Sequence, residues 1–576
     1  MTMTNKTRQI IVVVAVFVIA LASLGTIIGL LVNTGQMSEY SDGFRFELSG
    51  SRATITGYEG SDTDVVIPDK LKGHRVASIA KDAFKDTSVK SIKFNCTYSS
   101  FKIESDAFAK LTSLEKVVLP KNLKEIPSGA FEGCTALKTA IVPNSVTSIG
   151  SGAFKDCNVL SVVYNSERYS TDGDNAIKNT IYLPTSLLEI GASAFENCGA
   201  VTTVYIYKNL EKIGDKAFKE CDDLIRLQIE SNSEITSIGA EAFYNTNVHS
   251  TTSMPLTFPN LVSIGARAFS GNSSVDFTYM KLPTSVTSIG AYAFAESTYL
   301  NKVEMDKDMK IETMGQGVFK GCRSLINVTL PTEIKEIPAY TFMGCYQLLN
   351  GDDDFVIGKN VESIGDGAFA LYAGAASDTK FENYIKRILL VDEENEHFTT
   401  IRLADNYRDD DANSTFRQGL LTDAAGETVY AYYGSYDTKS YIKDNGRTFR
   451  LLNVSGMTLS SLKTIKPYAF AGVKFEYIEI PVTIKAIDEY AFYKSSVTTC
   501  YSYAIDWEFT QNTFLKVNLD LFKDEYGEDA NNSEEDVNNY AEIEVLLPSD
   551  KDGIEDFLRK LGEVDIKAGT FTNIAE

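Results

Sequence analysis

Three histidines and eight cysteines are the side chains of this sequence whose chemistry would count most, as acid–base groups, nucleophiles or metal ligands. The histidines, His74, His249 and His397, lie far apart, and none belongs to a nucleophile or metal-binding motif. The sequence also lacks a glycine-rich phosphate loop, a nucleophile elbow and an HExxH motif. We therefore expect a protein that is not an enzyme and that holds no cofactor or metal, although a stacked fold can bring distant residues together.

An acidic stretch between residues 405 and 414 offers carboxylates that could bind a cation. Asp405, Asp409, Asp410 and Asp411 lie close together between residues 405 and 414. The alternating acids and glycine of a calcium-binding EF-hand loop are absent. A solvated acidic loop is the preferred interpretation, and a calcium site is the alternative.

The overall charge excludes one class of partner. The chain has 576 residues, of which 44% are hydrophobic and 23% charged, so it can bury a large core. Lysine and arginine number 55 and aspartate and glutamate 78, which gives a net charge of −23. Proteins that bind nucleic acid neutralise phosphate with a basic surface, so no nucleic-acid partner is expected.

An uncharged apolar segment, Ile10 to Val32, follows Lys6 and Arg8. About twenty apolar residues span a bilayer as a helix, and the basic residues before it place the N-terminus in the cytoplasm. We expect a cytoplasmic segment at 1–9, a transmembrane signal anchor at 10–32 and a linker at 33–42. The alternative is a signal peptide cleaved after the small residues of Ala20-Leu21-Ala22. Both interpretations place the remaining chain across the membrane.

A short motif recurs through most of the chain. An isoleucine or methionine is followed five residues later by a phenylalanine, usually preceded by alanine, and most copies are 22–27 residues apart. The exceptions are the intervals Phe154 to Phe195 and Phe369 to Phe470. A unit of this size cannot bury a core alone and must stack on copies of itself. The motif phenylalanines, expected to form the structural core, are Phe84, Phe108, Phe131, Phe154, Phe195, Phe218, Phe243, Phe269, Phe294, Phe319, Phe342, Phe369, Phe470 and Phe492.

One unit shows the expected local structure. The alternation of Val117 and Leu119 predicts a short strand, which Pro120 ends because proline cannot donate to a ladder. Ala130, Cys134 and Leu137 follow at the spacing of one helical face, which predicts a short helical turn. Glycine after the motif isoleucine suits a tight bend, and Pro127 and Pro338 take its place in two units.

Most cysteines belong to this repeat. Six follow the motif phenylalanine by three residues, which predicts small buried side chains; disulfides between neighbouring units or a reactive role are the alternatives. No pair has CxxC spacing, so no zinc site is expected. The six are Cys134, Cys157, Cys198, Cys221, Cys322 and Cys345, and the others are Cys96 and Cys500.

The repeat resembles a known family. Segment 282–294, Leu-Pro-Thr-Ser-Val-Thr-Ser-Ile-Gly-Ala-Tyr-Ala-Phe, is similar to BspA-like leucine-rich repeats, and the resemblance runs with gaps from Val65 to Tyr503. The resemblance implies an α/β solenoid, a leucine-rich repeat superhelix with short strands on the concave face and short helical turns on the convex face. Family members are typically surface-exposed or secreted proteins of host-associated bacteria and some protists, and some are implicated in adhesion. The resemblance implies no catalytic residue.

The repeat pattern predicts the boundaries of the regions that follow the expected membrane span. An N-terminal β cap at 43–76 covers the open end of the array, because an open end exposes core and unpaired strand edges. Leucine-rich repeats at 77–369 form twelve units with an insertion at 166–178. A variant hairpin-type repeat or insertion is expected at 370–460, two further repeats at 461–503, and an acidic C-terminal cap at 504–576.

The strand residues that point outward form the expected binding surface. Tyrosine and arginine are favoured at interfaces, and a rigid sheet orders its side chains at little entropic cost. The candidate residues on the concave face are Lys116, Tyr205, Arg226, Tyr279, Lys281, Lys302, Glu304 and Tyr477. We expect an adhesin-like surface protein that binds an extracellular protein or glycan. A structural spacer without a ligand is the alternative, and an uncharacterised hydrolase is a remote one.

Overall fold

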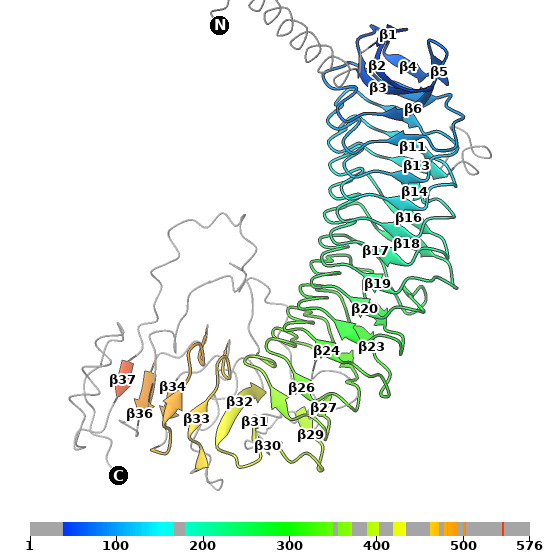
Figure 1. Cartoon of the computed structure of the whole chain (residues 1–576). Helices are drawn as coiled ribbons and strands as arrows, with labels where there is room; N and C mark the ends of the chain where they lie inside the picture. The colour runs from blue at the N-terminus through cyan, green and yellow to red at the C-terminus, as the bar shows by residue number, and fades with distance from the viewer. Residues whose placement is uncertain are drawn as a thin grey trace, which may run out of the picture.

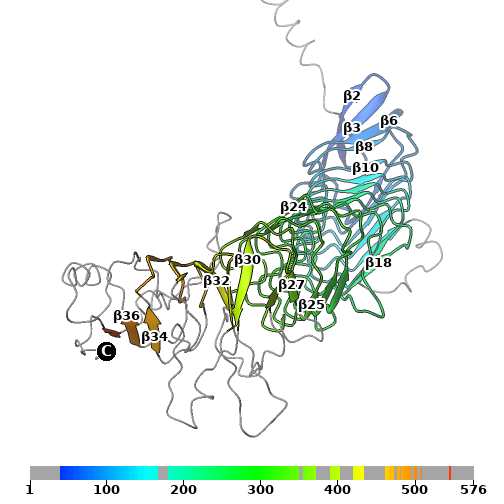
Figure 2. The same ribbon diagram turned by 90° about the horizontal axis from the view of Figure 1, so that it is seen from below.

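The computed structural model describes residues 39–165, 179–348, 355–370, 389–402, 419–433, 461–471, 477–480, 482–493, 499–502, 508 and 544–546. These residues wind into a long stack of coils (Figure 1). The stack runs nearly straight from β6 (His74–Ile79) to β20 (Ser263–Ile264) and then bends towards the C-terminal end. The view from below shows the same bend (Figure 2). The protein is therefore an elongated solenoid.

One side of each coil contributes a strand to the long-strand sheet, in which neighbouring coils pair in parallel. Its first part consists of β4 (Asp64–Ile67), β7 (Ser91–Phe94), β9 (Lys116–Val118), β11 (Thr139–Val142), β13 (Val162–Asn165), β14 (Thr180–Tyr182), β16 (Thr203–Ile206) and β18 (Arg226–Ile229). It resumes with β21 (Tyr279–Lys281), β23 (Lys302–Glu304) and β25 (Asn327–Val328), then β27 (Phe355–Ile357) and β29 (Leu389–Val391), and finally β34 (Tyr477–Ile480), β36 (Thr499–Ser502) and β37 (Glu544–Leu546).

A second side of each coil contributes two residues to the short-strand sheet, where a polar residue points outward and the motif isoleucine points into the core. Its strands are β10 (Glu125–Ile126), β12 (Ser148–Ile149), β15 (Glu189–Ile190), β17 (Lys212–Ile213), β19 (Ser237–Ile238), β20, β22 (Ser288–Ile289) and β24 (Thr313–Met314). The shorter runs β26 (Glu336–Ile337) with β28 (Ser363–Ile364), and β33 (Thr464–Ile465) with β35 (Ala486–Ile487), follow.

The N-terminal end of the stack is a small sheet that continues through β6 into the short-strand side of the first coils. Strands β2 and β3 form an antiparallel hairpin whose Phe46 and Ile55 face each other in the core. Strand β3 pairs in parallel with β6, and β6 pairs with β8, so the cap is hydrogen-bonded to the array. Its strands are β1 (Glu39–Ser41), β2 (Phe44–Ser49), β3 (Arg52–Tyr58), β5 (Lys70–Leu71), β6 and β8 (Lys102–Ile103).

The third side of each coil is a tight turn and not a helical turn. In the coil of Phe131, Gly129 and Gly133 have left-handed φ angles of 63° and 71°, which interrupt any helix. The N–H groups of Gly129, Phe131 and Gly133 each donate to a carbonyl of the next coil at 2.8 Å. Because these donors bond between coils, they are not available for the i to i−4 bonds of a helix. No α-helix occurs among the described residues.

The motif phenylalanines form one column of rings inside the stack. Between Phe108 and Phe342 the rings of neighbouring coils lie 5.3–5.8 Å apart, with planes within 15° of parallel. Tyr58 of the cap begins the column by packing on Phe84 at 5.6 Å. All fourteen rings are buried except that of Phe369, which is partly buried. Each motif ring from Phe84 to Phe342 therefore packs between two others, and Phe470 stacks on Phe492 further along the chain.

The sequence suggested that the glycine after the motif isoleucine allows a tight bend. The structure shows a different reason for glycine at this position. A Cβ on Gly214 would lie 2.7 Å from the backbone nitrogen of Ala192 in the preceding coil. The backbone angle there is not left-handed, so conformational freedom is not the requirement. Glycine is needed because two backbones touch where the coils stack.

The two prolines at this position interrupt the short-strand sheet. In a regular junction Gly150 donates its N–H to the carbonyl of Ile126 at 2.7 Å. Pro127 and Pro338 have no N–H to donate. Strand β10 accordingly does not pair with β8, and β26 does not pair with β24. The prolines thus end hydrogen-bonded runs as well as turning the chain.

Two irregular stretches add strands to the stack. The long interval between Phe154 and Phe195 supplies both β13 and β14 to the long-strand sheet, although β12 and β15 remain neighbours in the short-strand sheet. In the 370–460 region, β30 (Phe398–Arg402), β31 (Gly419–Asp423) and β32 (Thr428–Tyr433) form an antiparallel sheet. Strand β32 then pairs in parallel with β33, so this sheet continues the stack.

The repeat cysteines act as hydrogen-bond donors in the core. Each thiol donates to the carbonyl of the motif phenylalanine in the preceding coil, as Cys221 does to Phe195 at 3.1 Å. Burial raises the pKa of the Cys134 and Cys221 thiols to about 12. These thiols are therefore protonated at neutral pH. The seven cysteines whose side chains are described, all but Cys500, are free, so the disulfide alternative does not hold for them.

Several sequence predictions fall outside the described residues. They are the anchor at 10–32, the insertion at 166–178, the acidic residues Asp405, Asp409, Asp410 and Asp411, and most of 504–576. In the part of the chain that the structure describes, we find no helix with the length and apolar character needed to cross a bilayer.

The phenylalanine column yields a stability prediction. We expect Phe218→Ala to lower the free energy of unfolding of its coil and the two adjoining coils by about 3–5 kcal/mol, the usual range for truncating a buried aromatic ring. Amide hydrogen exchange of these coils in the full-length protein measures this loss. Lys208→Ala, at an exposed position nearby, is the control and should change stability by less than about 0.5 kcal/mol. A loss below about 1 kcal/mol for Phe218→Ala would contradict the packing.

Candidate binding surface on the long-strand sheet

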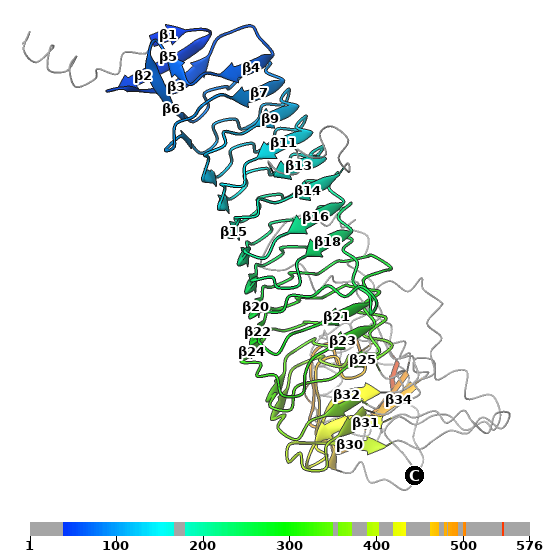
Figure 3. The same ribbon diagram turned by 90° about the vertical axis from the view of Figure 1, so that its right-hand side faces the viewer.

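The outward side chains of the long-strand sheet form two columns, which we call the strand face. Along each strand, buried residues such as Val117 and Val204 alternate with outward ones. The parallel register aligns Lys116 with Thr139, and Thr203 with Arg226, in one column. The other column aligns Val118 with Ile141, and Tyr205 with Gln228. Figure 3 shows this face from β7 to β25.

An aromatic patch occupies the second column between β9 and β16. It consists of Val118, Ile141, Tyr182 and Tyr205. The rings of Tyr182 and Tyr205 stack with centroids 4.6 Å apart. Ile141 and Tyr182 are only 5% and 2% exposed, so most of this patch is covered and is not an open docking surface. Tyr205 and Val118 are the partly exposed members.

A cluster of polar residues joined by hydrogen bonds and ion pairs lies on β21 and β23 of the strand face. Tyr279 donates its hydroxyl to Oε2 of Glu304 at 2.7 Å. The Lys281 ammonium lies 2.9 Å from Oε1 of Glu304, and that of Lys302 lies 3.5 Å from Oε2. The Lys302 ammonium also lies 5.8 Å from the centre of the Tyr279 ring. We call these four residues the Glu304 cluster.

The contacts within this cluster fix the protonation states of Glu304 and Tyr279 at neutral pH. The hydrogen bond from Lys281, followed by that from Tyr279, lowers the pKa of Glu304 to about 2. Burial, followed by the hydrogen bond to Glu304, raises the pKa of Tyr279 to about 12. At neutral pH Glu304 is ionised and Tyr279 is protonated, so the tyrosine is always the donor. Two lysines against one carboxylate leave the cluster with a net charge of +1, in a protein of net charge −23.

The structure brings together half of the eight residues that the sequence selected. Tyr279, Lys281, Lys302 and Glu304 form the cluster, although Tyr279 itself is buried under its neighbours. Tyr205 and exposed Arg226 lie on the adjacent strands β16 and β18. The coil that contains Ser250 separates Arg226 from the cluster, because Ile225 and Tyr279 both bond to that coil.

The other two selected residues lie elsewhere. Lys116 is half-buried on β9, at the N-terminal end of the strand face. Tyr477 belongs to β34, but its side chain is outside the described residues. Tyr182 of the aromatic patch was missed because the interval after Phe154 hides the phase of the repeat. The run of hydrophobic residues at 181–183 was the signal that could have identified a strand there.

The three histidines lie on separate coils of the described structure and do not come together in a reactive site. His74 lies in β6, and exposed His397 donates its backbone N–H to Asn395. Nδ1 of His249 lies 3.5 Å from Asp276. Among the residues that the structure describes, no three His, Cys, Asp or Glu side chains are placed to hold a metal ion.

Comparison with protein families identifies the repeats. The model of the BspA type leucine rich repeat region (6 copies) matches residues 61–183, 173–276, 262–388 and 445–522, which together exceed half of the chain. The chain therefore belongs to the BspA-type leucine-rich repeat family. The resemblance that the sequence suggested is confirmed, and so is the solenoid of leucine-rich repeats. No curated protein is significantly similar to this chain.

Several solved structures are similar to the stack of coils. A leucine-rich repeat protein from Bacteroides ovatus has 16% identity and a TM-score of 0.45, with 94% of this chain and 100% of that chain covered. A leucine rich cell surface protein from Faecalibacterium prausnitzii has 21% identity and a TM-score of 0.32, with 60% and 97% covered. The leucine rich repeat protein of T. pallidum has 19% identity and a TM-score of 0.25, with 46% and 90% covered.

The lowered pKa of Glu304 gives a test of the cluster. Because its pKa is about 2, we expect the Glu304 carboxylate to stay ionised at pH 4, where ordinary surface glutamates titrate. The stabilising contacts of the carboxylate are present above its ordinary pKa of 4.5 and are lost only as the pH falls through about 2. Carbon NMR of labelled glutamate carboxyls, with Glu304→Gln to assign the signal, measures this titration.

A matched pair of variants identifies the cause of the shift. Lys281→Ala removes the largest contribution and should move the Glu304 midpoint up towards 4.5. Lys116→Ala, on a distant strand of the same face, should leave the midpoint unchanged. An unaltered midpoint in Lys281→Ala would show that this contact does not form in solution.

Proposed function

We propose that this chain is a cell-surface recognition protein that binds an extracellular protein or glycan on the strand face. Its membership of the BspA-type family supports a surface protein. The observation that carries the proposal is the Glu304 cluster, whose side chains are held in one arrangement by hydrogen bonds and ion pairs. A partner that binds such a surface loses little side-chain entropy in doing so.

The charge of the cluster indicates which groups a partner would offer. The side chains of Lys281 and Lys302 are 56% and 44% exposed, while Glu304 between them is 37% exposed. A carboxylate or hydroxyl group of the partner would share the two ammonium groups with Glu304. Charge-assisted hydrogen bonds of this kind are stronger than neutral ones and require a defined geometry. They would supply specificity on an otherwise polar sheet.

Arg226 and Tyr205 extend this surface towards the N-terminal end of the stack. They lie on β18 and β16, beyond the one coil that separates them from the cluster. Arginine and tyrosine are the residues most enriched among those that dominate binding energy. A partner long enough to cross that coil would contact both parts of the strand face.

The competing proposal is a structural spacer, in which the solenoid only sets a distance from the cell and the strand face is an ordinary solvated sheet. The covered aromatic patch is compatible with either role. A hydrolase is a remote third proposal, because the three histidines lie on separate coils. The binding experiment below distinguishes the first two.

We also propose that the solenoid lies outside the cell and is held by a single membrane span at 10–32, with the linker at 33–42 leading into the β cap. The apolar segment and the basic residues before it support this orientation. The protein would instead be secreted if the segment were cleaved as a signal peptide.

Binding to the strand face predicts a loss of affinity on removing its cations. We expect the full-length protein to capture a partner saturably from host or bacterial surface extracts, and Lys302→Ala to weaken that capture at least tenfold. Tyr205→Ala should weaken it as well if the partner spans the coil of Ser250. Lys335→Ala removes a lysine that pairs with Glu362 on the short-strand side and should have no effect. Equal affinity of Lys302→Ala and Lys335→Ala, or no capture at all, would favour the spacer.

The anchor predicts retention in the membrane. Carbonate washing should leave the full-length protein in the membrane fraction, and protease added to intact cells should digest the solenoid. A soluble product whose N-terminus lies near Ser23 would instead establish cleavage.

A further inference from the structure

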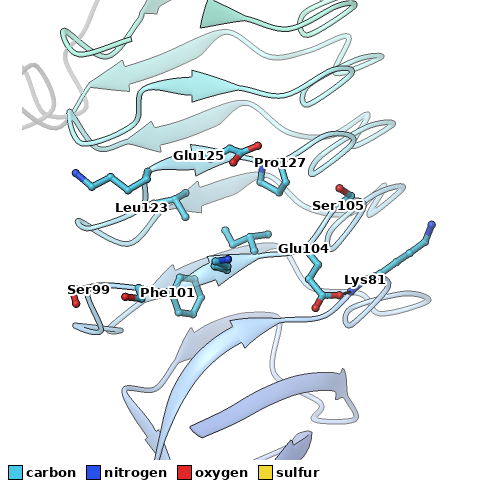
Figure 4. A pocket seen from close by; sticks show the side chains of 12 residues that line it. Lys81, Ser99, Phe101, Glu104, Ser105, Leu123, Glu125 and Pro127 are labelled. Atoms are coloured by element: carbon cyan, nitrogen blue, oxygen red, sulfur yellow. Dashed lines mark hydrogen bonds between the residues drawn. The ribbon is translucent and has the colours of Figure 1, made fainter. Parts of the chain in front are cut away.

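An open depression lies between the second and third coils, on the short-strand side. Its volume is about 700 Å³, and it lies between segment 99–105 and segment 123–127, with Lys81 at one end. Figure 4 shows it between the coil that carries Phe101 and Glu104 and the coil that carries Leu123 and Glu125. It is remote from the strand face in each coil, so it is a separate feature from the proposed binding surface.

The depression coincides with a break in hydrogen bonding. Strand β8 pairs only with β6, and β10 pairs only with β12. At the next junction Thr147 donates to the carbonyl of Lys124 at 2.9 Å, and Gly150 donates to that of Ile126 at 2.7 Å. Pro127 occupies the position of Gly150 and cannot donate to Ile103. The facing edges of β8 and β10 therefore keep backbone groups that the rest of the sheet uses for pairing.

The same two coils remain joined on their other sides. Ser91 of β7 pairs with Lys116 of β9 in the long-strand sheet. On the turn side Phe108 donates to the carbonyl of Ala130 at 3.0 Å, and the rings of Phe108 and Phe131 stack 5.4 Å apart. The two coils are thus joined on both of their other sides, and the gap is confined to the short-strand side.

The lining of the gap matches a polypeptide strand. Phe101, Ile103 and Leu123 are buried and form an apolar floor. Ser99, Ser100, Lys102 and Lys124 form a polar rim. Most strands of the short-strand sheet, such as β12, β20 and β22, have this same alternation, with a polar residue outside and an aliphatic residue inside. An extended segment with one inward aliphatic side chain would complete the pattern.

We propose that this gap binds an extended peptide segment of a partner protein, which is inserted as an added strand between β8 and β10. The backbone of the segment pairs with the two free edges, and an isoleucine, valine or leucine side chain packs on Phe101, Ile103 and Leu123. Main-chain hydrogen bonds supply affinity in strand addition, and the pockets for alternate side chains supply specificity. The added strand joins the cap and the repeat sheet into one ladder.

The probe for this site is the acetylated, amidated hexapeptide Val-Thr-Ser-Ile-Gly-Ser, the sequence of residues 146–151, which contains β12 of this chain. We expect it to bind the full-length protein saturably and to slow amide exchange at 102–103 and 124–126 at least tenfold. A peptide N-methylated at the nitrogens that correspond to Thr147 and Gly150, the two donors that this segment offers to β10 in the chain, has the same side chains and should not bind. Equal binding of both peptides, or no slowing at millimolar peptide, would overturn the proposal.

Two proline variants provide matched controls within the chain. Pro127→Gly restores the missing N–H, so β10 should pair with β8 and binding should fall at least tenfold. Pro338→Gly makes the same change at the other interruption and should leave the protection of 124–126 unchanged. Ser100→Trp, which fills the gap without altering the backbone, should also abolish binding, so the test does not depend on how Pro127→Gly folds. Unchanged binding in both Pro127→Gly and Ser100→Trp would place the peptide elsewhere and refute the site.

Discussion

Hydrogen bonding between successive coils is the constraint on which the rest of this structure depends. Each coil bonds to its neighbours through the long strands and again through the turn around the motif phenylalanine, so both sides repeat at the same spacing. That spacing brings the rings of the phenylalanine column into contact and leaves no room for a side chain at Gly214. A repeat of this size has too little core to fold alone, and these shared contacts make the array stable.

Ion pairs follow the same geometry. Lys138 pairs with Glu115 at 3.0 Å and Lys219 with Glu241 at 2.8 Å, each across one coil junction. An exposed pair such as Lys138 with Glu115 contributes little stability by itself, whereas the side chains of Lys219 and Glu241 are only 20% and 17% exposed. The positions of these pairs indicate which coils are neighbours. If the stacking shifted by one coil, the opposite charges would be separated. In a chain of net charge −23, such pairs also reduce repulsion between adjacent acidic coils.

Departures from the repeat create the features that distinguish this solenoid. Pro127 removes one backbone donor and leaves a depression with an apolar floor between two coils. The long interval after Phe154 adds an extra strand, β14, and with it the stacked pair of Tyr182 and Tyr205. Regular coils form the scaffold, and the proposed peptide site lies where one element of the repeat is replaced.

The sequence by itself determined the repeat, its phenylalanine core, the buried cysteines and the family, because each depends on local periodicity that repeats many times. It could not show that the turns are non-helical, since alternate N–H groups of each turn bond to another coil and the others bond three residues back within the turn. It selected Tyr279, Lys281, Lys302 and Glu304 only as separate outward residues; their assembly depends on the register between β21 and β23. The burial of Ile141 and Tyr182 and the gap beside Pro127 were likewise decided by tertiary structure. The first depends on which segments become neighbours around the long interval after Phe154, and the second on the absence of pairing between β8 and β10.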